Sequence, residues 1–254
     1  MFIPTEWRTK FANIDIDDEG MSAAEVLKCH LENEIVYIKS IDNKYSKTTY
    51  SVHREKEVMQ WLSGKLNVPR VIEFGVENNR EFVVMSELKG AHIDDFESTP
   101  EVYVSHLAKA IQLLHTIEIS NCPFDSSVDV RLKELAWLIQ NNLASLDDWG
   151  DATNLKFSNP NKFYQWLCNN KPAEEFVFSH GDITANFFVN GQDLHFYDLG
   201  RAGIADRWYD IAFCINSIRK SFGDKKYEDM FFDMLKIQPN YEKIDYFILL
   251  DAMF

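Results

Sequence analysis

Cysteine is scarce in this sequence, and the few cysteines do not follow a spacing that would predict disulfides. The 254 residues include only four: Cys29, Cys122, Cys168 and Cys214. They lie far apart, without a CxxC pair and without the spacing of metal ligands, which argues against a disulfide framework and against a zinc-binding motif. We therefore expect reduced thiols, most of them in the hydrophobic core.

Long apolar runs are also missing. The N-terminal stretch MFIPTEWRTKF has no basic patch followed by an apolar run, so it does not look like a secretory signal. No segment approaches the roughly 20 apolar residues that cross a bilayer. Internal repeats and low-complexity tracts do not occur either. We expect a cytoplasmic protein with no membrane partner.

Basic residues are in deficit. The chain has 26 lysines and arginines against 40 aspartates and glutamates, a formal net charge of −14. This balance disfavours a nucleic-acid partner, whose phosphates need cationic contacts, and tolerates a cationic ligand. With 254 residues, 46% of them hydrophobic, the chain can bury a substantial core and suits one large domain or two closely coupled lobes.

The two parts of the chain show different periodicities. Up to about residue 86 the sequence predicts short strands and one helix, with EIVYIKSID as a strand and RVIEFGV and EFVVMSE joined by a tight turn at Asn78 and Asn79. After Gly90 the apolar period becomes about 3.6. One predicted helical face contains Tyr103, Leu107, Ala110, Ile111 and Leu114, and another contains Leu132, Leu135, Leu138, Ile139 and Leu143. The change falls at MSELKG. We therefore expect an α+β fold with a small β-rich lobe over residues 1–88, a hinge, and a larger, mainly helical lobe over residues 89–254.

A lysine and a glutamate in the first part are expected to meet. Strand alternation places Lys39 on the same face as Tyr37. In the following helix, Glu55 falls within an apolar stripe of Val52, Met59, Leu62 and Leu66. A buried carboxylate needs a cationic partner, and Lys39 is the natural candidate, although Glu55 at a solvated helix edge is the alternative. Protein kinases use such a strand lysine and helix glutamate to hold the α and β phosphates of ATP.

The segment DDEGMSAAEV lies where a kinase covers the phosphates with a loop. It lacks the repeated glycines of a GxGxxG loop, so Gly20, Met21 and Ser22 would have to hold phosphate through backbone amides and one hydroxyl. A helix that begins here with Ser22 as its cap is the alternative, and the spacing alone favours the helix.

The stretch FVFSHGDITANFFVNGQDLHFYDLG predicts a strand, a loop and a hairpin turned by Asn190 and Gly191. This hairpin would bring Asp198 back beside the loop that contains Asp182 and Asn186. Phosphoryl transfer needs one carboxylate to accept a hydrogen bond from the attacking hydroxyl, and an amide and a second carboxylate to bind magnesium. Polar residues on a β-meander would explain the turn, but not the lysine and glutamate upstream.

Three segments resemble the aminoglycoside 3′-phosphotransferases, bacterial resistance kinases with a protein-kinase-like fold. They are HGDITAN, FYDLGRAGIADRWYDIAFC and the terminal YFILLDAMF, and the resemblance extends from DEGMS to Phe254. It implies a two-lobed kinase that uses ATP, with GTP left open, and Mg2+ to phosphorylate an aminoglycoside hydroxyl, expected to be the 3′ position. It also implies antibiotic resistance as the outcome, and a monomer or weak homodimer.

The resemblance also implies roles for individual residues. The catalytic base would be Asp182, and the metal ligands would be Asn186 and Asp198. The nucleotide would be bound by Met21, Ser22, Tyr37, Lys39, Glu55, Ser86, Glu87 and Leu88. The substrate side would include Asp148, Asp151, Arg201, Asp251 and Phe254 with its terminal carboxylate, and Arg201 would also help to orient the metal-binding loop. His180 and Asp210 would support the catalytic loop without reacting.

The sequence departs from the family pattern at the catalytic loop and at the substrate pocket. The step from Asp182 to Asn186 is one residue shorter than in most relatives. Lys220 and Ala252 stand where relatives often have acids, and Thr184 and Ala185 fill the loop where an acid sometimes occurs. Two alternatives follow: a kinase of the same fold that acts on a macrolide, an amino alcohol or a metabolite, and a nucleotide-binding module without turnover.

Overall fold

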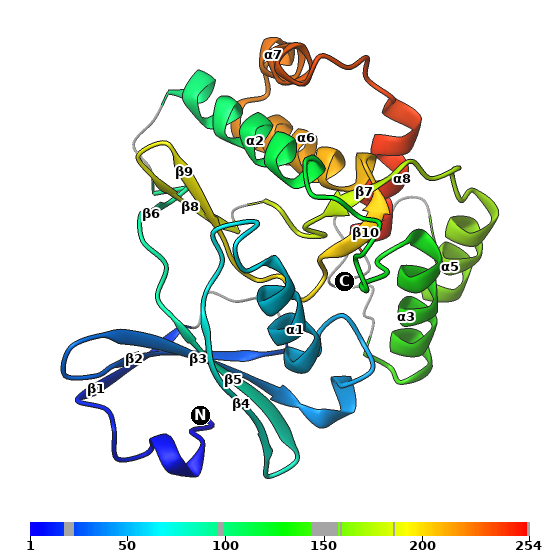
Figure 1. Ribbon diagram of the computed structural model, residues 1–254. Coiled ribbons are helices and arrows are strands. Elements are labelled where there is room, and N and C mark those ends of the chain that lie inside the picture. The colour runs from blue at the N-terminus through cyan, green and yellow to red at the C-terminus, as the bar shows by residue number, and fades with distance from the viewer. Residues whose placement is uncertain (18–22, 96–98, 144–156, 158, 185, 253–254) are drawn as a thin grey trace. The chain divides into compact units, whose positions relative to one another are not determined.

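The computed structural model describes residues 1–17, 23–95, 99–143, 157, 159–184 and 186–252 (Figure 1). The chain forms two compact units. The first combines Met1–Phe96 with Ala185–Arg201, and the second combines Glu97–Thr184 with Ala202–Phe254. The first unit therefore takes one segment from late in the sequence.

The first unit is built on a five-stranded antiparallel sheet with the order β1-β2-β3-β5-β4 (Figure 1). Its strands are β1 (Asn13–Asp17), β2 (Glu25–His30), β3 (Ile35–Asp42), β4 (Val71–Glu77) and β5 (Arg80–Ser86). Two 3-10 helices, η1 (Thr5–Trp7) and η2 (Asn43–Tyr45), and one α-helix, α1 (Val52–Leu62), belong to the same unit. The prediction of a sheet-rich first part with one helix is confirmed.

The turn between β4 and β5 shows why asparagine was informative. Asn78 and Asn79 have φ angles of 52° and 60°, and the strands pair immediately outside them at Glu77 and Arg80. Two consecutive left-handed residues form the mirror-image turn that matches the twist of paired strands, and asparagine tolerates this conformation better than most residues do. The predicted tight turn is confirmed.

Helix α1 begins at a defined cap. The hydroxyl of Ser51 accepts a hydrogen bond from the Arg54 amide at 3.2 Å and donates one to the Glu81 carboxylate at 2.9 Å. The cap ties the start of the helix to β5. The helix ends at Leu62, so the expected extension of its apolar stripe to Leu66 is wrong. Leu66 instead forms an isolated bridge with Ser63 after the chain has left the helix.

The late segment of the first unit contributes a hairpin beside a short strand. The strands β8 (Phe187–Asn190) and β9 (Asp193–Phe196) pair antiparallel, and β6 (Ala91–His92) pairs with β8. Asn190 pairs with Asp193, so Gly191 and Gln192 form the two-residue loop. The expected turn at Asn190 and Gly191 is therefore wrong by one position. Glycine supplies the left-handed residue here, with φ 62°, and Asn190 is the last residue of the strand.

The second unit is mainly helical. Its helices are α2 (Pro100–His115), α3 (Val128–Gln140), α5 (Pro160–Asn169), α6 (Trp208–Phe222), α7 (Lys225–Leu235) and α8 (Tyr241–Asp251), and its strands β7 (Phe176–Ser179) and β10 (Gly203–Asp206) pair antiparallel. Helix α2 has Thr99 as its cap and Pro100 at its first position, a favourable start because proline's missing N–H is not needed there. The change to helical periodicity after Gly90 is confirmed.

The two predicted helical faces are found with one exception. Leu107, Ala110, Ile111 and Leu114 of α2 are fully buried, and Leu132, Leu135 and Leu138 of α3 are also in the core. Leu143 lies beyond the end of α3 and is exposed, so its assignment to the buried face is wrong. Asn142, with φ 54°, ends the helical geometry one residue earlier.

The cysteines divide evenly between core and periphery. Cys29 and Cys214 are buried, Cys122 is half-buried and Cys168 is exposed, and all four are free thiols. Burial raises the pKa of Cys29 to about 11. The expectation that most of the thiols lie in the core is wrong, because only two of the four are buried. Among the described residues, no helix has the length and apolarity needed to cross a membrane.

Candidate active site

A buried lysine with two carboxylate partners forms the electrostatic centre of the first unit. The Lys39 side chain on β3 is only 9% exposed. Its ammonium nitrogen lies 2.8 Å from Oε2 of Glu55 and 2.5 Å from Oδ1 of Asp198. The predicted Lys39–Glu55 ion pair is confirmed, and Asp198 joins it from 159 residues farther along the chain. One strand, one helix and one late loop meet at this cation.

The physical cause of this arrangement is the cost of burying charge. Burial lowers the pKa of Lys39, but the Asp198 and Glu55 carboxylates more than offset this effect, and the pKa is raised above its ordinary value. Burial raises the pKa of Glu55, whereas the Lys39 ammonium and the Leu199 amide act in the opposite direction. Each group is therefore tolerated in the interior because the others are present.

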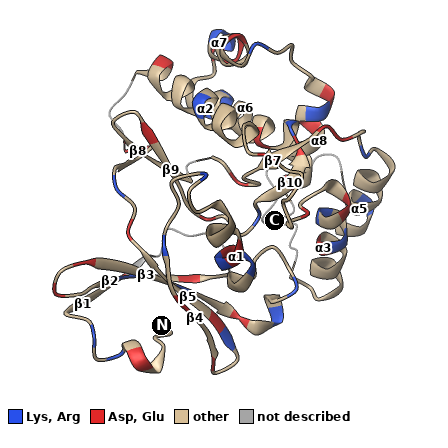
Figure 2. Ribbon diagram, in the orientation of Figure 1, with Lys and Arg blue, Asp and Glu red and all other residues tan. Residues whose placement is uncertain are grey.

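Helix α1 also holds the loop that contains Asp198. Glu55 accepts a hydrogen bond from the Leu199 amide at 3.3 Å, and the Arg54 guanidinium donates to the Gly200 carbonyl at 2.8 Å. A Cβ atom on Gly200 would lie 2.7 Å from the Thr49 carbonyl oxygen, so only glycine allows this close approach. Figure 2 shows the acidic and basic residues side by side along α1. Asp198 itself has φ 54°, a conformation that needs such support.

Asn186 lies next to Asp198 in the same unit. The Tyr197 amide donates to the Asn186 carbonyl at 3.2 Å, directly after the Phe187–Phe196 pair of the β8–β9 hairpin. The Asp198 side chain is 38% exposed, although its Oδ1 binds the Lys39 ammonium. An amide and an accessible carboxylate are hard oxygen ligands of the kind Mg2+ prefers, and this donor set fits that ion. The predicted metal ligands are thus neighbours. Their role remains a prediction.

The second unit contains Asp182, in a loop that follows β7. Asp210 of α6 is buried and accepts hydrogen bonds from the His180 amide at 2.7 Å and the Gly181 amide at 2.9 Å. Gly181 has φ 80°, which directs the chain sharply away from the strand. His180 is completely buried, as expected for a supporting residue. Burial raises the pKa of Asp210, while His180 and the two amides act against this shift.

These hydrogen bonds fix the direction in which the loop leaves β7. Asp182, the next residue of the loop, is half-buried. Asp182 belongs to the second unit, whereas Asn186 and Asp198 belong to the first. The gathering of all three at one mouth stays a prediction.

The remaining predicted nucleotide residues lie along β3 and after β5. Tyr37 is half-buried on the Lys39 face, pairs with Met85, and has the Lys28 ammonium 5.7 Å from its ring centroid. Ser86 ends β5, and its amide donates to the Arg70 carbonyl at 3.0 Å. Glu87 is exposed and lies 3.3 Å from the Lys28 ammonium. Leu88 is half-buried in the connection that follows.

The predicted substrate residues are only partly described. Arg201 donates to the Tyr50 hydroxyl at 3.3 Å and lies over its ring, and Asp251 is the half-buried last residue of α8. Five predicted residues lie outside the described residues: Met21, Ser22, Asp148, Asp151 and Phe254. The alternative of a helix after Ser22 is wrong, because Glu25 and Val26 already belong to β2 and pair with β3.

Sequence reasoning missed Arg54 and Tyr50. Both contact the segment after Asp198, Arg54 through Gly200 and Tyr50 through Arg201. The one available signal was that Arg54 directly precedes Glu55 in the first turn of α1, where a basic side chain can reach the same loop as the glutamate.

Comparison with known proteins identifies the family. A family model described as the phosphotransferase enzyme family matches residues 37–247. The chain belongs to this family. It is 54% identical over 238 residues to an aminoglycoside 3′-phosphotransferase of Campylobacter jejuni, covering 93% of this chain and 94% of the relative. The resemblance to that group of phosphotransferases is confirmed.

Solved structures of the family share the fold. The crystal structure of an aminoglycoside 3′-phosphotransferase of type VIII superposes with a TM-score of 0.81 at 21% identity, covering 95% of this chain and 93% of that one. An aminoglycoside phosphotransferase from Streptomyces rimosus, in complex with ADP and streptomycin, gives 0.75 at 20% identity and covers 93% and 94%. The expected α+β, protein-kinase-like fold of this phosphotransferase is confirmed.

The buried pair can be tested against a surface pair on the same helix. Glu55→Ala should lower the free energy of unfolding by about 2–4 kcal/mol, near the lower end for a broken buried pair because Asp198 still faces Lys39. Glu57→Ala, which removes an exposed carboxylate paired with Lys56, should cost less than about 1 kcal/mol. Denaturant unfolding of both variants measures the difference. Equal losses would show that Lys39 does not depend on Glu55.

The hydrogen bond from Arg54 can be tested by amide exchange. Arg54→Gln removes a charge-assisted bond to the Gly200 carbonyl, worth about 1.5–3 kcal/mol, so exchange of the neighbouring Leu199 amide should accelerate about tenfold or more. Gln60→Ala, at an exposed position of α1, should leave this amide as protected as in the unaltered protein. Unchanged protection in Arg54→Gln would show that the helix does not hold this loop.

Proposed function

We propose that this phosphotransferase moves the γ-phosphoryl group of ATP to a hydroxyl of an aminoglycoside antibiotic, at the 3′ position, and thereby confers resistance. The observation that supports it most is the buried Lys39 ammonium between Glu55 and Asp198. A phosphate-binding lysine must stay charged and be held in one direction, and two carboxylate partners achieve both. The 54% identity to a protein named aminoglycoside 3′-phosphotransferase supports the acceptor.

The proposed chemistry assigns one step to each residue of the site. Lys39, oriented by Glu55, binds the α and β phosphates of the nucleotide. Asn186 and Asp198 would hold Mg2+, which would offset the negative charge of the phosphate groups. Asp182 accepts a hydrogen bond from the attacking hydroxyl and so orients it toward the γ-phosphorus. The acceptor oxygen then bonds to phosphorus as the bond to the β-phosphate oxygen breaks, and ADP leaves.

The nucleotide side of the proposal rests on the first unit. Tyr37 stacks on the adenine, and the backbone of Ser86, Glu87 and Leu88 binds its edge; Met21 and Ser22 cover the phosphates. ATP is the proposed donor, and GTP is the alternative. We propose residues 1–88 as the nucleotide-binding lobe and residues 89–254 as the catalytic and substrate-binding lobe. Asp198 belongs to the second lobe by sequence, and its ion pair with Lys39 links it to the residues of the first.

The proposed substrate site consists of acidic groups. Asp251 and the terminal carboxylate of Phe254, with Asp148 and Asp151, are the proposed partners of the aminoglycoside ammonium groups. Arg201 is a cation held by Tyr50, so we propose that it orients the loop after Asp198 and does not bind the cationic substrate. The net charge of −14 fits a polycationic ligand and supports the absence of a nucleic-acid partner. A monomer or weak homodimer, located in the cytoplasm, completes the proposal.

A second acceptor class is favoured by one observation. Lys220 is exposed near the end of α6, where many relatives are expected to have an acid, and a lysine there repels an ammonium group. An uncharged or singly charged acceptor, such as a macrolide, an amino alcohol or a metabolite, would not meet this repulsion. Turnover of such acceptors above that of kanamycin would favour the second class.

The acceptor can be tested with purified protein. Kanamycin and neomycin with Mg-ATP should release ADP, and an aminoglycoside that lacks the 3′-hydroxyl should not, because no nucleophile would stand at the transferred group. Coupled ADP release measures both. Turnover without a 3′-hydroxyl would contradict the position, and no turnover on any aminoglycoside would contradict the acceptor class.

The role of Asp182 can be separated from folding. Asp182→Asn keeps the size of the side chain but removes the acceptor carboxylate, and kcat should fall by at least about 10²-fold, the scale of a lost general base. The KM for ATP should change little, because this residue does not bind the nucleotide. Asp193→Asn, at an exposed position of the β8–β9 hairpin, is the matched control and should retain full activity. Retained activity in Asp182→Asn would assign the base elsewhere.

A further inference from the structure

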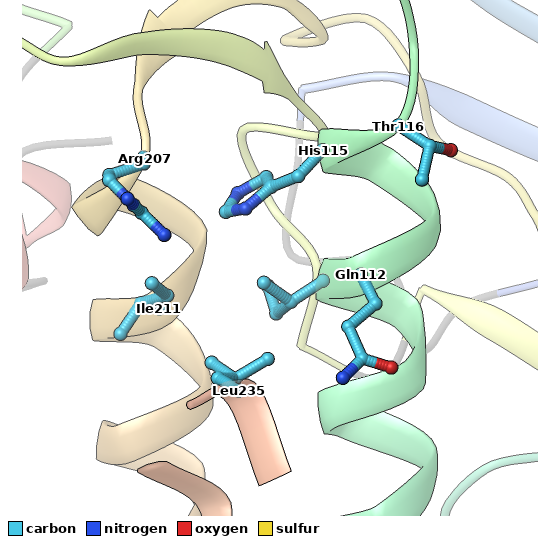
Figure 3. Close-up of a pocket in the computed structure, with 7 residues that line it drawn as sticks. Gln112, His115, Thr116, Arg207, Ile211 and Leu235 are labelled. Carbon is cyan, nitrogen blue, oxygen red and sulfur yellow. The ribbon is translucent and has the colours of Figure 1, made fainter. Parts of the chain in front are cut away.

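A cavity in the second unit is not used by the proposed chemistry. It has a volume of about 260 Å³ and lies between α2, the start of α6 and the end of α7 (Figure 3). Its lining residues are Ile111, Gln112, His115, Thr116, Arg207, Ile211 and Leu235. Pockets for drug-sized ligands measure roughly 300–1,000 Å³, so this cavity suits a smaller molecule.

Two side chains at one end of the cavity leave polar atoms unsatisfied. Figure 3 shows the imidazole of His115 pointing from α2 toward the Arg207 guanidinium at the start of α6. Nε2 of His115 and Nε of Arg207 are buried, and neither has a hydrogen-bond partner within the described part of the chain. Buried polar atoms of this kind normally find a partner, because leaving one unpaired costs about 1–3 kcal/mol. Both nitrogens therefore indicate something that binds between them.

The rest of the lining is apolar or already engaged. Ile111 of α2 and Ile211 of α6 are fully buried and line the cavity, and Leu235 lines it from the end of α7. The amide nitrogen of Gln112 donates to the Met234 carbonyl at 2.9 Å, so it is occupied in joining α2 to α7. The cavity thus has one polar end and an apolar wall, and it favours a ligand with the same division.

The polar end is cationic. Arg207 is the charged residue of the lining, and its guanidinium is only loosely paired, 4.0 Å from the Glu175 carboxylate. Glu175 is half exposed and binds the Lys243 ammonium more closely, at 3.0 Å. Burial, with Arg207 beside it, lowers the pKa of His115 to about 4, so the imidazole is neutral at pH 7. Neither α6 nor α7 places a carboxylate in the lining.

We propose that this cavity binds a short aliphatic monocarboxylate. The carboxylate accepts hydrogen bonds from Nε of Arg207 and from the imidazole of His115, and the alkyl chain lies against Ile111, Ile211 and Leu235. An ionised acceptor suits a guanidinium, whose N–H groups match a carboxylate in geometry. The alkyl chain gains from burial in proportion to its area. A neutral alcohol, inorganic phosphate and water alone are the competing occupants.

The test is a titration of the full chain followed by NMR of its histidines, labelled with 13C. Hexanoate should shift the His115 resonance saturably, with a Kd on the order of 1 mM. It should also raise the pKa of His115 by about 1–3 units, as an opposite charge within a few ångströms does. Hexan-1-ol, of equal chain length, should not raise this pKa, and inorganic phosphate should bind at least about tenfold more weakly because it gains nothing from the apolar wall.

Two substitutions complete the design. Arg207→Gln should weaken hexanoate binding at least about tenfold, and Arg207→Lys, which keeps the charge, should restore part of it. Lys226→Gln removes an exposed charge from α7 and should leave the binding unchanged. Thermal melting of each variant confirms folding. No saturable shift of His115, an equal pKa change with hexan-1-ol, equal binding of phosphate, or undiminished binding by Arg207→Gln would each overturn the proposal.

Discussion

The first unit depends on one buried cation. The charge of Lys39 is compensated by Glu55 from helix α1 and by Asp198 from a loop more than 150 residues later. The two ion pairs therefore join segments that are far apart in the sequence. Removing either carboxylate would leave the buried ammonium with a single partner, which costs more than losing a surface pair. The sheet, the helix and the late hairpin are therefore constrained to meet at this side chain.

Helix α1, which supplies Glu55, also holds the loop that follows Asp198. Glu55 divides its two oxygens between the Lys39 ammonium and the Leu199 amide, while Arg54 binds the Gly200 carbonyl. Consecutive residues of one helix thus bind the amide of Leu199 and the carbonyl of Gly200, the two residues that follow Asp198. Because Asp198 has a left-handed backbone, the loop needs such contacts next to it to keep the carboxylate in place.

Features that depend on residues close together in the sequence could be predicted, and features that depend on distant residues could not. The tight turn at Asn78 and Asn79 and the Lys39–Glu55 pair depend on local periodicity and on the cost of burying charge, and both are readable from short segments. Local signals failed by a residue or two where tertiary contacts decide: Gly191 forms the second hairpin turn instead of Asn190, and α1 stops before Leu66. Arg54 went unnoticed because its partner is a backbone carbonyl, which has no sequence signature.

The two carboxylates on Lys39 are not equivalent, and the difference bears on the proposed metal site. The Glu55 side chain is 3% exposed, whereas that of Asp198 is 38% exposed. If Asp198 turns its charge toward Mg2+, Lys39 loses part of one partner while still buried. Glu55 cannot leave, since it is enclosed and also bound to Leu199. The enclosed carboxylate therefore keeps the cation compensated whichever way Asp198 is engaged, and under the proposed function a phosphate group would be the other partner of the ammonium.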